Sequence, residues 1–485
     1  MTNAERAGFL PGIPVDDVHW ETLNFARDAR QVQVAVPLLS EAQLESLARE
    51  VRAAGQMNLR PLLVTDVMAA VDTAIARLLD RGNPYRCKAE ALLPLVTGYD
   101  HEMVRLGLTE YLKTFRRPGL EKFLTEDFSN SAILDRFVPI PKGGFAQAFG
   151  PALLYQSWAG NVPGLSLWSL ISGLLVKAPT IGKLASAEPL FAGWFAEVLA
   201  DVEPKLAQCM GIVWWPGGDE AREAAVLRHA DVVLAYGGNE ALAQIRARTP
   251  ISTRVLSYGH KVSFGIVARS ALDAQQAWSL AHQAAYDVVR YDQQGCYSPH
   301  VFFVERNGSV SPEEFAHYVA NELASFEHKF PRRALAIDEA STIAKWRDNE
   351  EALGVSQAGR QLLSDPSGAW AVAYVETPEN LTPSGLNRTV KIVAIDNVEE
   401  VAEHVSPYRG VLQTAGVAAA PQALFQIAQM LGNVGVTRVT ALGCMSAPEA
   451  GWHHDGRFNL LDLVTLTEIE RSAEVAAEAF APYRN

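Results

Sequence analysis

The stretch Tyr291-Asp-Gln-Gln-Gly-Cys-Tyr-Ser-Pro299 decides how the rest of the chain is interpreted. A helical pattern runs into it from Ala271 to Arg290, and a strand-like run, His300–Glu305, leaves it. The dipeptide Gln294-Gly295 predicts a turn that presents Cys296, where its thiol can meet a carbonyl carbon. Cysteine attacks as the thiolate and its unperturbed pKa is about 8.5, so the site must lower that pKa or supply a base. The alternative is a buried, inert cysteine.

The composition places the chain among acidic globular proteins. Its 485 residues exceed what one hydrophobic core usually serves, so we expect two or three domains. The net charge of −13 and the pI near 5.4 argue against nucleic-acid binding, which needs a basic face. We expect a cytoplasmic protein, because Met1–Gly8 lacks the features of a secretory signal. The apolar stretch Val162–Val176 is shorter than the roughly 20 residues of a membrane span.

The cysteine and histidine spacings give no metal or disulfide pattern. The four cysteines lie far apart and include no Cys-x-x-Cys pair: Cys87, Cys209, Cys296 and Cys444. We interpret the three besides Cys296 as structural. Adjacent histidines, as in His453-His454-Asp455, point to different sides of an extended chain and share a metal poorly. We therefore predict a turn held by Asp455-Gly456 there, and no metal site.

The order of patterns predicts an α/β protein with two open parallel-sheet domains. The protruding ribbon in 131–150 is more typical of subunit contact than of catalysis. The N-terminal helices would cover one face of a sheet or contact an acyl chain or a partner. The expected parts are a helical N-terminal region, 1–130; a β-hairpin bridging element, 131–150 with 457–471; a nucleotide-binding domain, 151–259; a catalytic domain, 260–445; and a C-terminal loop and strand, 446–485.

Three loops follow predicted strands of the nucleotide-binding domain, where open parallel sheets bind ligands. Gly160–Pro163 follows the strand 153–159, Lys177–Thr180 ends the strand 174–178, and Gly237-Gly238 follows the strand 231–236. The sequence lacks a G-x-G-x-x-G fingerprint after a strand. The glycine pair before a helix could admit a phosphate, and its alternative is an ordinary turn.

These motifs resemble those of a known superfamily. Asn161-Val-Pro163, Lys177-Ala-Pro179, Gly237-Gly238, a Gly-x-Lys at 259–261 and Gln294-Gly-Cys296 occur in the order typical of aldehyde dehydrogenases. Trp452–Val464 and Asp292–Cys296 resemble more closely the LuxC-type acyl-CoA reductases, the fatty-acid reductase subunits known from bacterial luminescence and related lipid pathways. The resemblance spans roughly residues 95–470 and implies an aldehyde-dehydrogenase-like fold.

The resemblance also implies roles for individual residues. Cys296 would be the nucleophile, and Asn161 would donate its side-chain amide to the oxyanion beside the Cys296 backbone N–H. Lys177 would contact the adenosine ribose, although a solvated strand-end lysine is the alternative. The other expected contacts are Gly237 and Gly238 with the nicotinamide and pyrophosphate, and Pro163 opening the phosphate-facing helix.

Three departures from the family pattern refine this expectation. Hydrolytic members begin Glu-Leu-Gly-Gly-Lys where this chain has Ser257-Tyr-Gly-His-Lys261, so the base that activates water is missing, as a reductase requires. His260 is then a candidate proton donor, or a sheet-edge residue satisfied by the backbone. Thr180 stands where NAD enzymes carry Glu, which favours NADPH over NADH. The Glu-x-Phe-Gly-Pro motif has no clear counterpart around Pro383–Thr389.

We therefore expect reduction of a fatty acyl thioester, on CoA or on a protein, to the aldehyde with NADPH through an acyl-Cys296 intermediate. A homo-oligomer, dimer or tetramer, and an acyl-protein synthetase partner are also expected. The alternatives are a CoA-acylating or hydrolytic aldehyde dehydrogenase, and a non-catalytic subunit of an acyl-protein synthetase.

Overall fold

The computed structural model describes residues 4–27 and 29–482, and its internal contacts divide the chain into two units. The first comprises residues up to Thr97, Leu108–Gly259 and the residues from Glu449 onward. The second comprises Gly98–Gly107 and His260–Pro448. The change from one unit to the other after Gly259 falls where the sequence predicted a domain border, whereas the inclusion of 98–107 in the second unit was not predicted.

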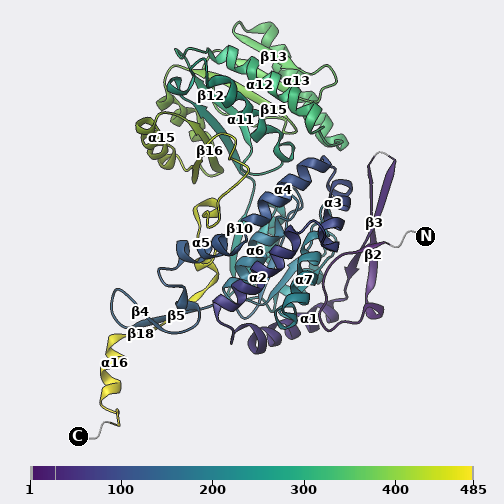
Figure 1. Ribbon diagram of the computed structural model, residues 1–485, viewed down its shortest axis with the longest axis vertical. Helices are drawn as coiled ribbons and strands as arrows, with labels where there is room; N and C mark the ends of the chain where they lie inside the picture. The colour runs from purple at the N-terminus through teal and green to yellow at the C-terminus, as the bar shows by residue number, and fades with distance from the viewer. Residues whose placement is uncertain (1–3, 28, 483–485) are drawn as a thin grey trace. The chain divides into compact units, whose positions relative to one another are not determined.

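A five-stranded parallel sheet forms the centre of the first unit (Figure 1). Its strand order is β10-β9-β6-β7-β8, so the chain starts in the middle and reverses direction across the sheet between β6 and β9. The crevice at such a reversal, beyond the carboxyl ends of the strands, is where open α/β sheets bind ligands. The strands are β6 (Leu154–Ser157), β7 (Thr180–Lys183), β8 (Met210–Val213), β9 (Val232–Tyr236) and β10 (Arg254–Tyr258).

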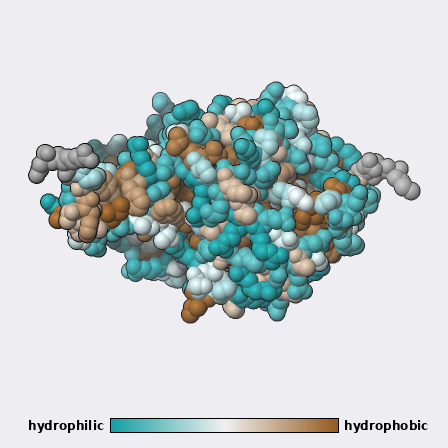
Figure 2. All heavy atoms as spheres, turned by 90° about the horizontal axis from the view of Figure 1, so that it is seen from below, coloured by the Kyte–Doolittle hydropathy of each residue, from teal (hydrophilic) through white to brown (hydrophobic). Residues whose placement is uncertain are grey.

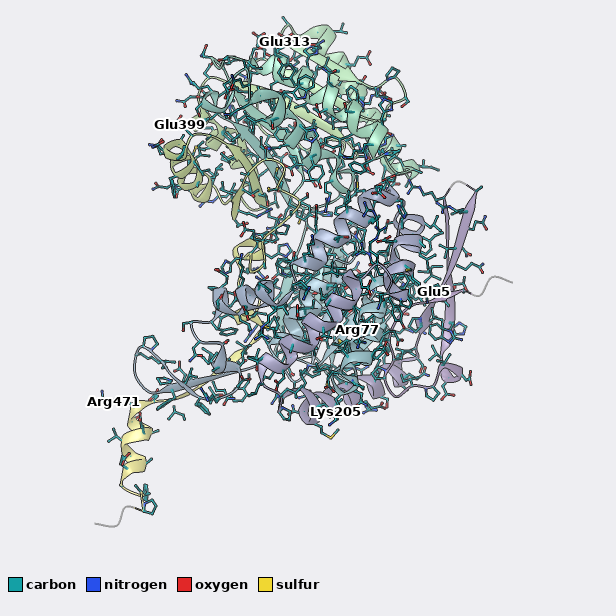
Figure 3. The ribbon with its side chains drawn as sticks, viewed as in Figure 1. Glu5, Arg77, Lys205, Glu313, Glu399 and Arg471 are labelled. Carbon is teal, nitrogen blue, oxygen red and sulfur yellow. The ribbon has the colours of Figure 1, made fainter. Side chains whose placement is uncertain are left out.

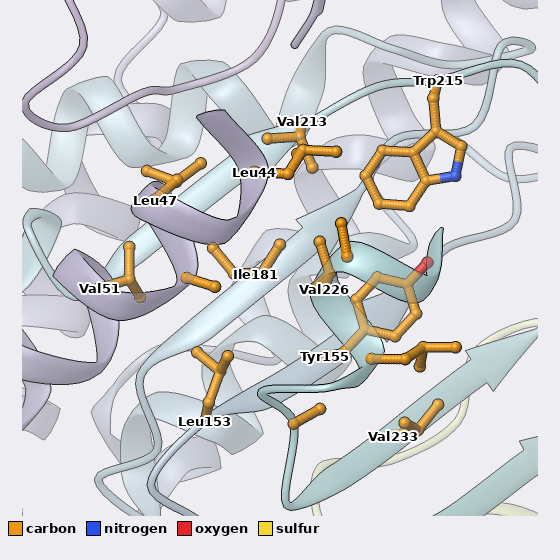
Figure 4. Close-up of a cluster of buried hydrophobic side chains, with 14 of the residues drawn as sticks. Leu44, Leu47, Val51, Leu153, Tyr155, Ile181, Val213, Trp215, Val226 and Val233 are labelled. Atoms are coloured by element: carbon orange, nitrogen blue, oxygen red, sulfur yellow. The ribbon is translucent and has the colours of Figure 1, made fainter. Parts of the chain in front are cut away.

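Helices cover both faces of this sheet. The helix α1 begins with the predicted capping box, in which Ser40 and Gln43 satisfy each other's backbone N–H groups. Leu44, Leu47 and Val51 of α1 pack onto side chains of the sheet and of α9 in one buried cluster (Figure 4). The helices of the unit are α1 (Glu41–Ala54), α2 (Val64–Leu79), α3 (Pro84–Thr97), α5 (Arg117–Asp127), α6 (Ser166–Leu175), α7 (Phe191–Val202), α8 (Pro204–Ala207), α9 (Glu220–Leu227) and α10 (Asn239–Arg248). The residues of α4 (His101–Lys113) are divided between the two units at Gly107.

The predicted strand at 174–178 is wrong. Leu174 and Leu175 end the helix α6, and the strand β7 begins only at Thr180. Every residue of α6 is buried, so its C-terminal part, Gly173-Leu-Leu175, offers no contrast between buried and exposed positions. A continuous apolar run does not distinguish a buried strand from a buried helix, which explains the error.

The N-terminal region, 1–130, was predicted to be mostly helical, but its first part consists of strands. Its first part is a three-stranded sheet of β1 (Glu5–Arg6), β3 (Arg30–Leu38) and β2 (His19–Arg27). Val32, Val34 and Val36 alternate along β3, a period of two that favours a strand. Glu5 of β1 accepts a hydrogen bond from the indole N–H of Trp194, which ties this sheet to α7 (Figure 3).

A second small sheet forms an arm of the first unit. The strand β5 (Phe145–Phe149) pairs antiparallel with β4 (Val138–Pro139) and with β18 (Thr465–Ile469), so a ribbon and a later strand meet as the sequence predicted. The helix α16 (Arg471–Glu478) follows β18 and buries none of its residues. Hydrophobic side chains gather on this arm (Figure 2): the exposed ones are Phe149, Phe458, Leu466, Val475 and Phe480.

A seven-stranded sheet forms the second unit, in the order β13-β14-β15-β12-β11-β16-β17. Only the pairing of the edge strand β13 is antiparallel, and β13 was not predicted. The strands are β11 (Val262–Val267), β12 (Pro299–Glu305), β13 (Arg360–Ser364), β14 (Ala371–Val375), β15 (Thr389–Ile395), β16 (Leu412–Ala418) and β17 (Arg438–Thr440). The helices are α11 (Ala277–Val289), α12 (Pro312–Lys329), α13 (Ile337–Ser356), α14 (Val401–Val405) and α15 (Pro421–Asn433).

Candidate active site

Cys296 lies on a turn between the end of α11 and the start of β12. Its side chain is only partly buried, which favours the accessible thiol over the inert one. Cys209 provides the contrast, because burial raises the pKa of its thiol to about 12. Gly295 before Cys296 is required sterically, since a Cβ there would lie 2.2 Å from the ring of Tyr297. The turn therefore has a defined conformation.

Ser263 holds the backbone at Cys296. Its hydroxyl donates to the Cys296 carbonyl oxygen at 2.8 Å and accepts the N–H of Thr414 at 3.1 Å. Ser263 is fully buried and stands at an irregularity in the pairing of β11 with both neighbouring strands. A side-chain hydroxyl thus replaces regular strand hydrogen bonds and ties the Cys296 carbonyl to β11 and β16.

The guanidinium group of Arg438 supplies positive charge close to the turn. Burial lowers the pKa of Arg438, while Tyr297, Asp287, Cys444 and Cys296 oppose that effect electrostatically. Arg438 remains a cation at neutral pH. It donates to the carbonyl oxygens of Met445 at 2.6 Å and Cys444 at 2.9 Å. A cation whose field reaches Cys296 favours the thiolate over the thiol.

Asp287 supports the loop to which Arg438 donates. It accepts the N–H groups of Gly443 at 2.6 Å and Met445 at 3.0 Å. Burial raises its pKa to about 7, against the lowering effect of these hydrogen bonds. Asp287 therefore takes up a proton in the folded protein several pH units above its usual range.

In the first unit, two predicted cofactor loops follow neighbouring strands. Gly160–Pro163 follows β6 and Gly237-Gly238 follows β9, so both stand at the carboxyl ends where the strand order reverses. Gly238 is the N-cap of α10, and the Gly237 N–H donates to the Tyr258 carbonyl at 3.2 Å. Pro163 lies in the turn before α6 rather than opening the helix, which starts at Ser166. Asn161 is half-buried in the same turn.

Lys177 and Thr180 stand at the opposite edge of the sheet, because β7 begins at Thr180. Lys177 has a positive φ of 58° and its ammonium group lies 2.5 Å from the Asp135 carboxylate. Thr180 is fully buried and its hydroxyl donates to the Ala178 carbonyl at 3.2 Å. The expected roles of these two residues depended on a strand ending near 178, and that strand does not exist.

Lys183 is the last residue of β7, the second strand of this sheet in chain order. It pairs with Ser157 of β6, and its ammonium group lies 5.4 Å from the ring centroid of Trp215. Burial lowers the pKa of Lys183, with Glu223 and Asp219 opposing. Sequence reasoning missed it because the apolar run before Lys177 was taken for the strand. A short strand with an internal glycine, Thr180-Ile-Gly-Lys183, was the available signal.

The motif from Trp452 onward packs at the carboxyl ends of β9 and β10. The imidazole of His454 stacks on Tyr258 at 4.5 Å, and Tyr258 stacks on Tyr236 at 5.0 Å. Asp455 has a positive φ of 55° before Gly456, so the predicted turn is present. Sequence reasoning missed the ring stack, because its members come from three distant segments.

Residues 4–27 and 29–482, which the structure describes, contain neither a metal-ligand cluster nor a membrane-spanning helix. Within those ranges, no group of three or more His, Cys, Asp or Glu side chains could hold a metal ion. No helix among the same residues combines the length and apolarity needed to cross a bilayer.

His260, the candidate proton donor, is exposed at the start of the second unit.

Comparisons with known proteins identify relatives for most of the chain. Residues 59–466 match the sequence model of the family described as acyl-CoA reductase (LuxC). A long-chain acyl-protein thioester reductase of Photorhabdus luminescens is 27% identical over 390 residues, covering 79% of this chain and 77% of that protein. A protein of the same name from Vibrio harveyi is 24% identical over 379 residues, covering 77% and 76%.

Solved structures establish the fold. The aldehyde dehydrogenase KauB from Pseudomonas aeruginosa superposes with a TM-score of 0.74 at 14% identity, covering 96% of each chain. An NADP-dependent glyceraldehyde-3-phosphate dehydrogenase from Bacillus halodurans C-125 superposes with a TM-score of 0.73 at 12% identity, covering 96% of this chain and 99% of that one. The predicted aldehyde-dehydrogenase-like α/β fold is confirmed.

We predict that Ser263→Ala lowers the free energy of unfolding by about 1–3 kcal/mol, because it leaves a buried carbonyl and a buried N–H without their partner. It should also change the rate at which iodoacetamide alkylates Cys296. Ser270→Ala is the control, since Ser270 similarly accepts a backbone N–H, that of Ala420, at an exposed site. Equal alkylation rates in wild type and Ser263→Ala would contradict the role of this hydroxyl.

The raised pKa of Asp287 predicts a pH dependence of stability. Between about pH 4 and 7 the unfolded chain has lost this proton and the folded one retains it, so the stabilising contribution falls as pH rises, by about 1 kcal/mol per pH unit. Asp287→Asn should remove that slope in urea unfolding measured across this range. A variant whose pH profile parallels the wild type would show that Asp287 titrates normally.

Proposed function

The chain belongs to the acyl-CoA reductase (LuxC) family, and we propose on this premise that it reduces a long-chain fatty acyl thioester to the aldehyde, with NADPH as hydride donor and Cys296 as nucleophile. The family match confirms the class of enzyme predicted from the sequence, an acyl-thioester reductase. The names of the relatives support a long acyl chain carried by a protein. Acyl-CoA is the alternative thioester substrate.

One observation carries the assignment of the nucleophile. Cys296 is a partly exposed thiol whose backbone carbonyl is held by Ser263 and which lies within the field of the Arg438 cation. A thiolate is favoured under these conditions, and its turn is fixed before substrate arrives. Cys209, by contrast, is buried and burial raises the pKa of its thiol.

In the first step the Cys296 thiolate attacks the carbonyl carbon of the acyl thioester. A C–S bond to Cys296 forms, and the carbonyl electron pair moves to oxygen. We propose that the Asn161 amide and the Cys296 N–H donate to this oxyanion; loss of one such donor typically costs about 10²–10³ in rate. When the oxyanion collapses, the bond to the donor sulfur breaks and that thiolate leaves with the electron pair, to be protonated.

The first unit fits a nicotinamide dinucleotide at the crevice where its strand order reverses. A Cβ built on Gly237 would meet only the Ala241 side chain, at 3.9 Å, so the backbone there is open to a ligand. Lys183 stands at the carboxyl end of β7 on the same edge. We propose that Lys183, in place of Lys177, contacts the adenosine ribose, with Gly237, Gly238 and the Asn161–Pro163 turn beside the rest of the cofactor.

A nicotinamide bound there supplies hydride to the carbonyl carbon of the acyl-Cys296 thioester. Hydride addition would give a hemithioacetal alkoxide on Cys296; its oxygen electron pair re-forms the carbonyl, the C–S bond breaks, and the aldehyde leaves while Cys296 returns to the thiolate. His260, exposed at the start of the second unit, is the proposed donor of the proton that the leaving thiolate takes up in the first step. Ser257 of β10 stands where hydrolytic relatives of this fold carry a glutamate, so the acyl thioester is not exposed to a base at that position.

We also propose a homo-oligomer built through the arm. The strand β18 is an edge strand of its sheet, and Leu466 and Phe149 on the same sheet are exposed. An exposed apolar edge strand is a template for pairing with another chain. A second copy of the chain is the proposed occupant, and an acyl-protein synthetase is a proposed further partner that delivers the acyl group.

Acyl transfer to Cys296 provides the first test. Incubation with a radiolabelled long-chain acyl thioester and no cofactor should label the wild type and Cys87→Ala, whose thiol is exposed elsewhere, but not Cys296→Ala. NADPH should then release labelled aldehyde. Release of free acid would favour a thioesterase or hydrolytic enzyme, and a folded protein without label would favour a non-catalytic subunit.

Cofactor choice provides the second test. Ser186 is exposed and lies three residues after Lys183, the spacing at which NAD-dependent relatives of this fold place a ribose-binding glutamate. Ser186→Glu should therefore repel a 2′-phosphate and shift the NADPH/NADH ratio of kcat/KM by about tenfold toward NADH, roughly 1.4 kcal/mol. Ser186→Gln controls for size. An unchanged ratio in the glutamate variant would show that this position does not contact the ribose.

A further inference from the structure

We propose that Arg388 is a positioning residue for Cys296, acting by clamping two left-handed turns together. This inference rests on the proposed function, in which Cys296 is the nucleophile. The first turn is Tyr291, Asp292 and Gln293, with φ of 47°, 47° and 62°. The second is Leu386, Asn387 and Arg388, with φ of 58°, 48° and 71°. Residues other than glycine adopt this conformation only where their surroundings enforce it.

The Arg388 side chain supplies that enforcement. Its Nε donates to Asp292 Oδ1, one Nη to Glu327 Oε2 and the other Nη to the Phe330 carbonyl, each at 2.7 Å. Arg388 is fully buried and Asp292 is 1% exposed. The planar guanidinium therefore fixes the first turn relative to the end of α12 from three directions.

Gln293 carries the constraint from the clamp to the nucleophile's loop. Its Oε1 accepts the N–H groups of Arg388 at 2.7 Å and Thr389 at 3.0 Å. Its Nε2 donates to the carbonyls of Thr389 at 2.9 Å and Pro299 at 2.8 Å. All four hydrogen bonds of the amide are thus made, and none of them is exposed to water.

The bond from Gln293 to Pro299 closes the base of a loop that has Cys296 at its middle. Cys296 lies three residues from each end of this loop. A second pair of contacts joins the turns directly, since Asn387 N–H donates to the Asp292 carbonyl at 3.1 Å and Gln294 Nε2 donates to Asn387 Oδ1 at 3.1 Å. Release of Arg388 frees the base of the loop, and with it the direction of the thiol.

The test compares Arg388→Gln and Asp292→Asn with a matched control, Glu350→Gln. Glu350 is also buried and pairs with Lys391 on β15, three residues beyond Arg388, so its loss breaks a comparable ion pair away from the loop. At equal folded fraction, the two clamp variants should lower kcat about 10²-fold with KM for the acyl thioester within threefold of wild type. Glu350→Gln should keep kcat within threefold.

The double variant Asp292→Asn/Arg388→Gln should match the worse single variant, because both changes break one clamp. The pH profile of Cys296 alkylation should shift in the clamp variants and stay unchanged in Glu350→Gln. If Arg388→Gln does not fold, the isosteric Asp292→Asn decides. A clamp variant with the kcat, KM and alkylation profile of the control would overturn the proposal.

The clamp and the proposed function fail in distinguishable ways. Turnover by Cys296→Ala would refute the nucleophile, whatever the clamp variants do. A wild-type alkylation profile in both clamp variants, with Cys296→Ala inactive, would instead leave the nucleophile in place and refute the positioning role of Arg388.

Discussion

The buried pair of Arg388 and Asp292 is the contact on which the loop around Cys296 depends. It holds two runs of three residues, 291–293 and 386–388, in the left-handed region of backbone conformation. That conformation costs L-residues roughly 1–2 kcal/mol each. Such strain persists only where the surroundings over-determine the conformation. Here a fully buried guanidinium with three acceptors and a glutamine amide with four partners do so.

Holding a loop with a buried ion pair carries a large desolvation cost. Two charges lose their hydration, and hydrophobic residues of similar volume often stabilise a fold equally well. An apolar side chain, however, has no preferred direction, whereas the guanidinium recognises Asp292, Glu327 and a carbonyl in one geometry. A nucleophile requires direction more than it requires stability, because a displacement of about 1 Å can cost 10²-fold in rate.

The sequence predicted what local pattern controls and missed what tertiary contact controls. The Gln294-Gly295 dipeptide predicted the turn that presents Cys296. The last residues of the buried helix α6 were predicted as a strand, because a short apolar run does not distinguish a buried helix from a buried strand. The lysine at the strand end was therefore predicted to be Lys177, whereas it is Lys183. The clamp could not be predicted, since Asp292 and Arg388 are joined only by folding.

The residues of the proposed site lie at the carboxyl edge of the sheet in the first unit and at the amino edge of the sheet in the second. In the first, the glycine turns and Lys183 follow strands, as ligand sites of parallel sheets do. In the second, Cys296 precedes β12 and is separated from the carboxyl end of α11 by the turn Arg290–Gln293. Burial raises the pKa of the neighbouring Tyr297, and Arg290 and Arg438 oppose it. Arg438 also interacts electrostatically with Cys296, so the charge near this thiol comes from a side chain placed beside it rather than from a helix end.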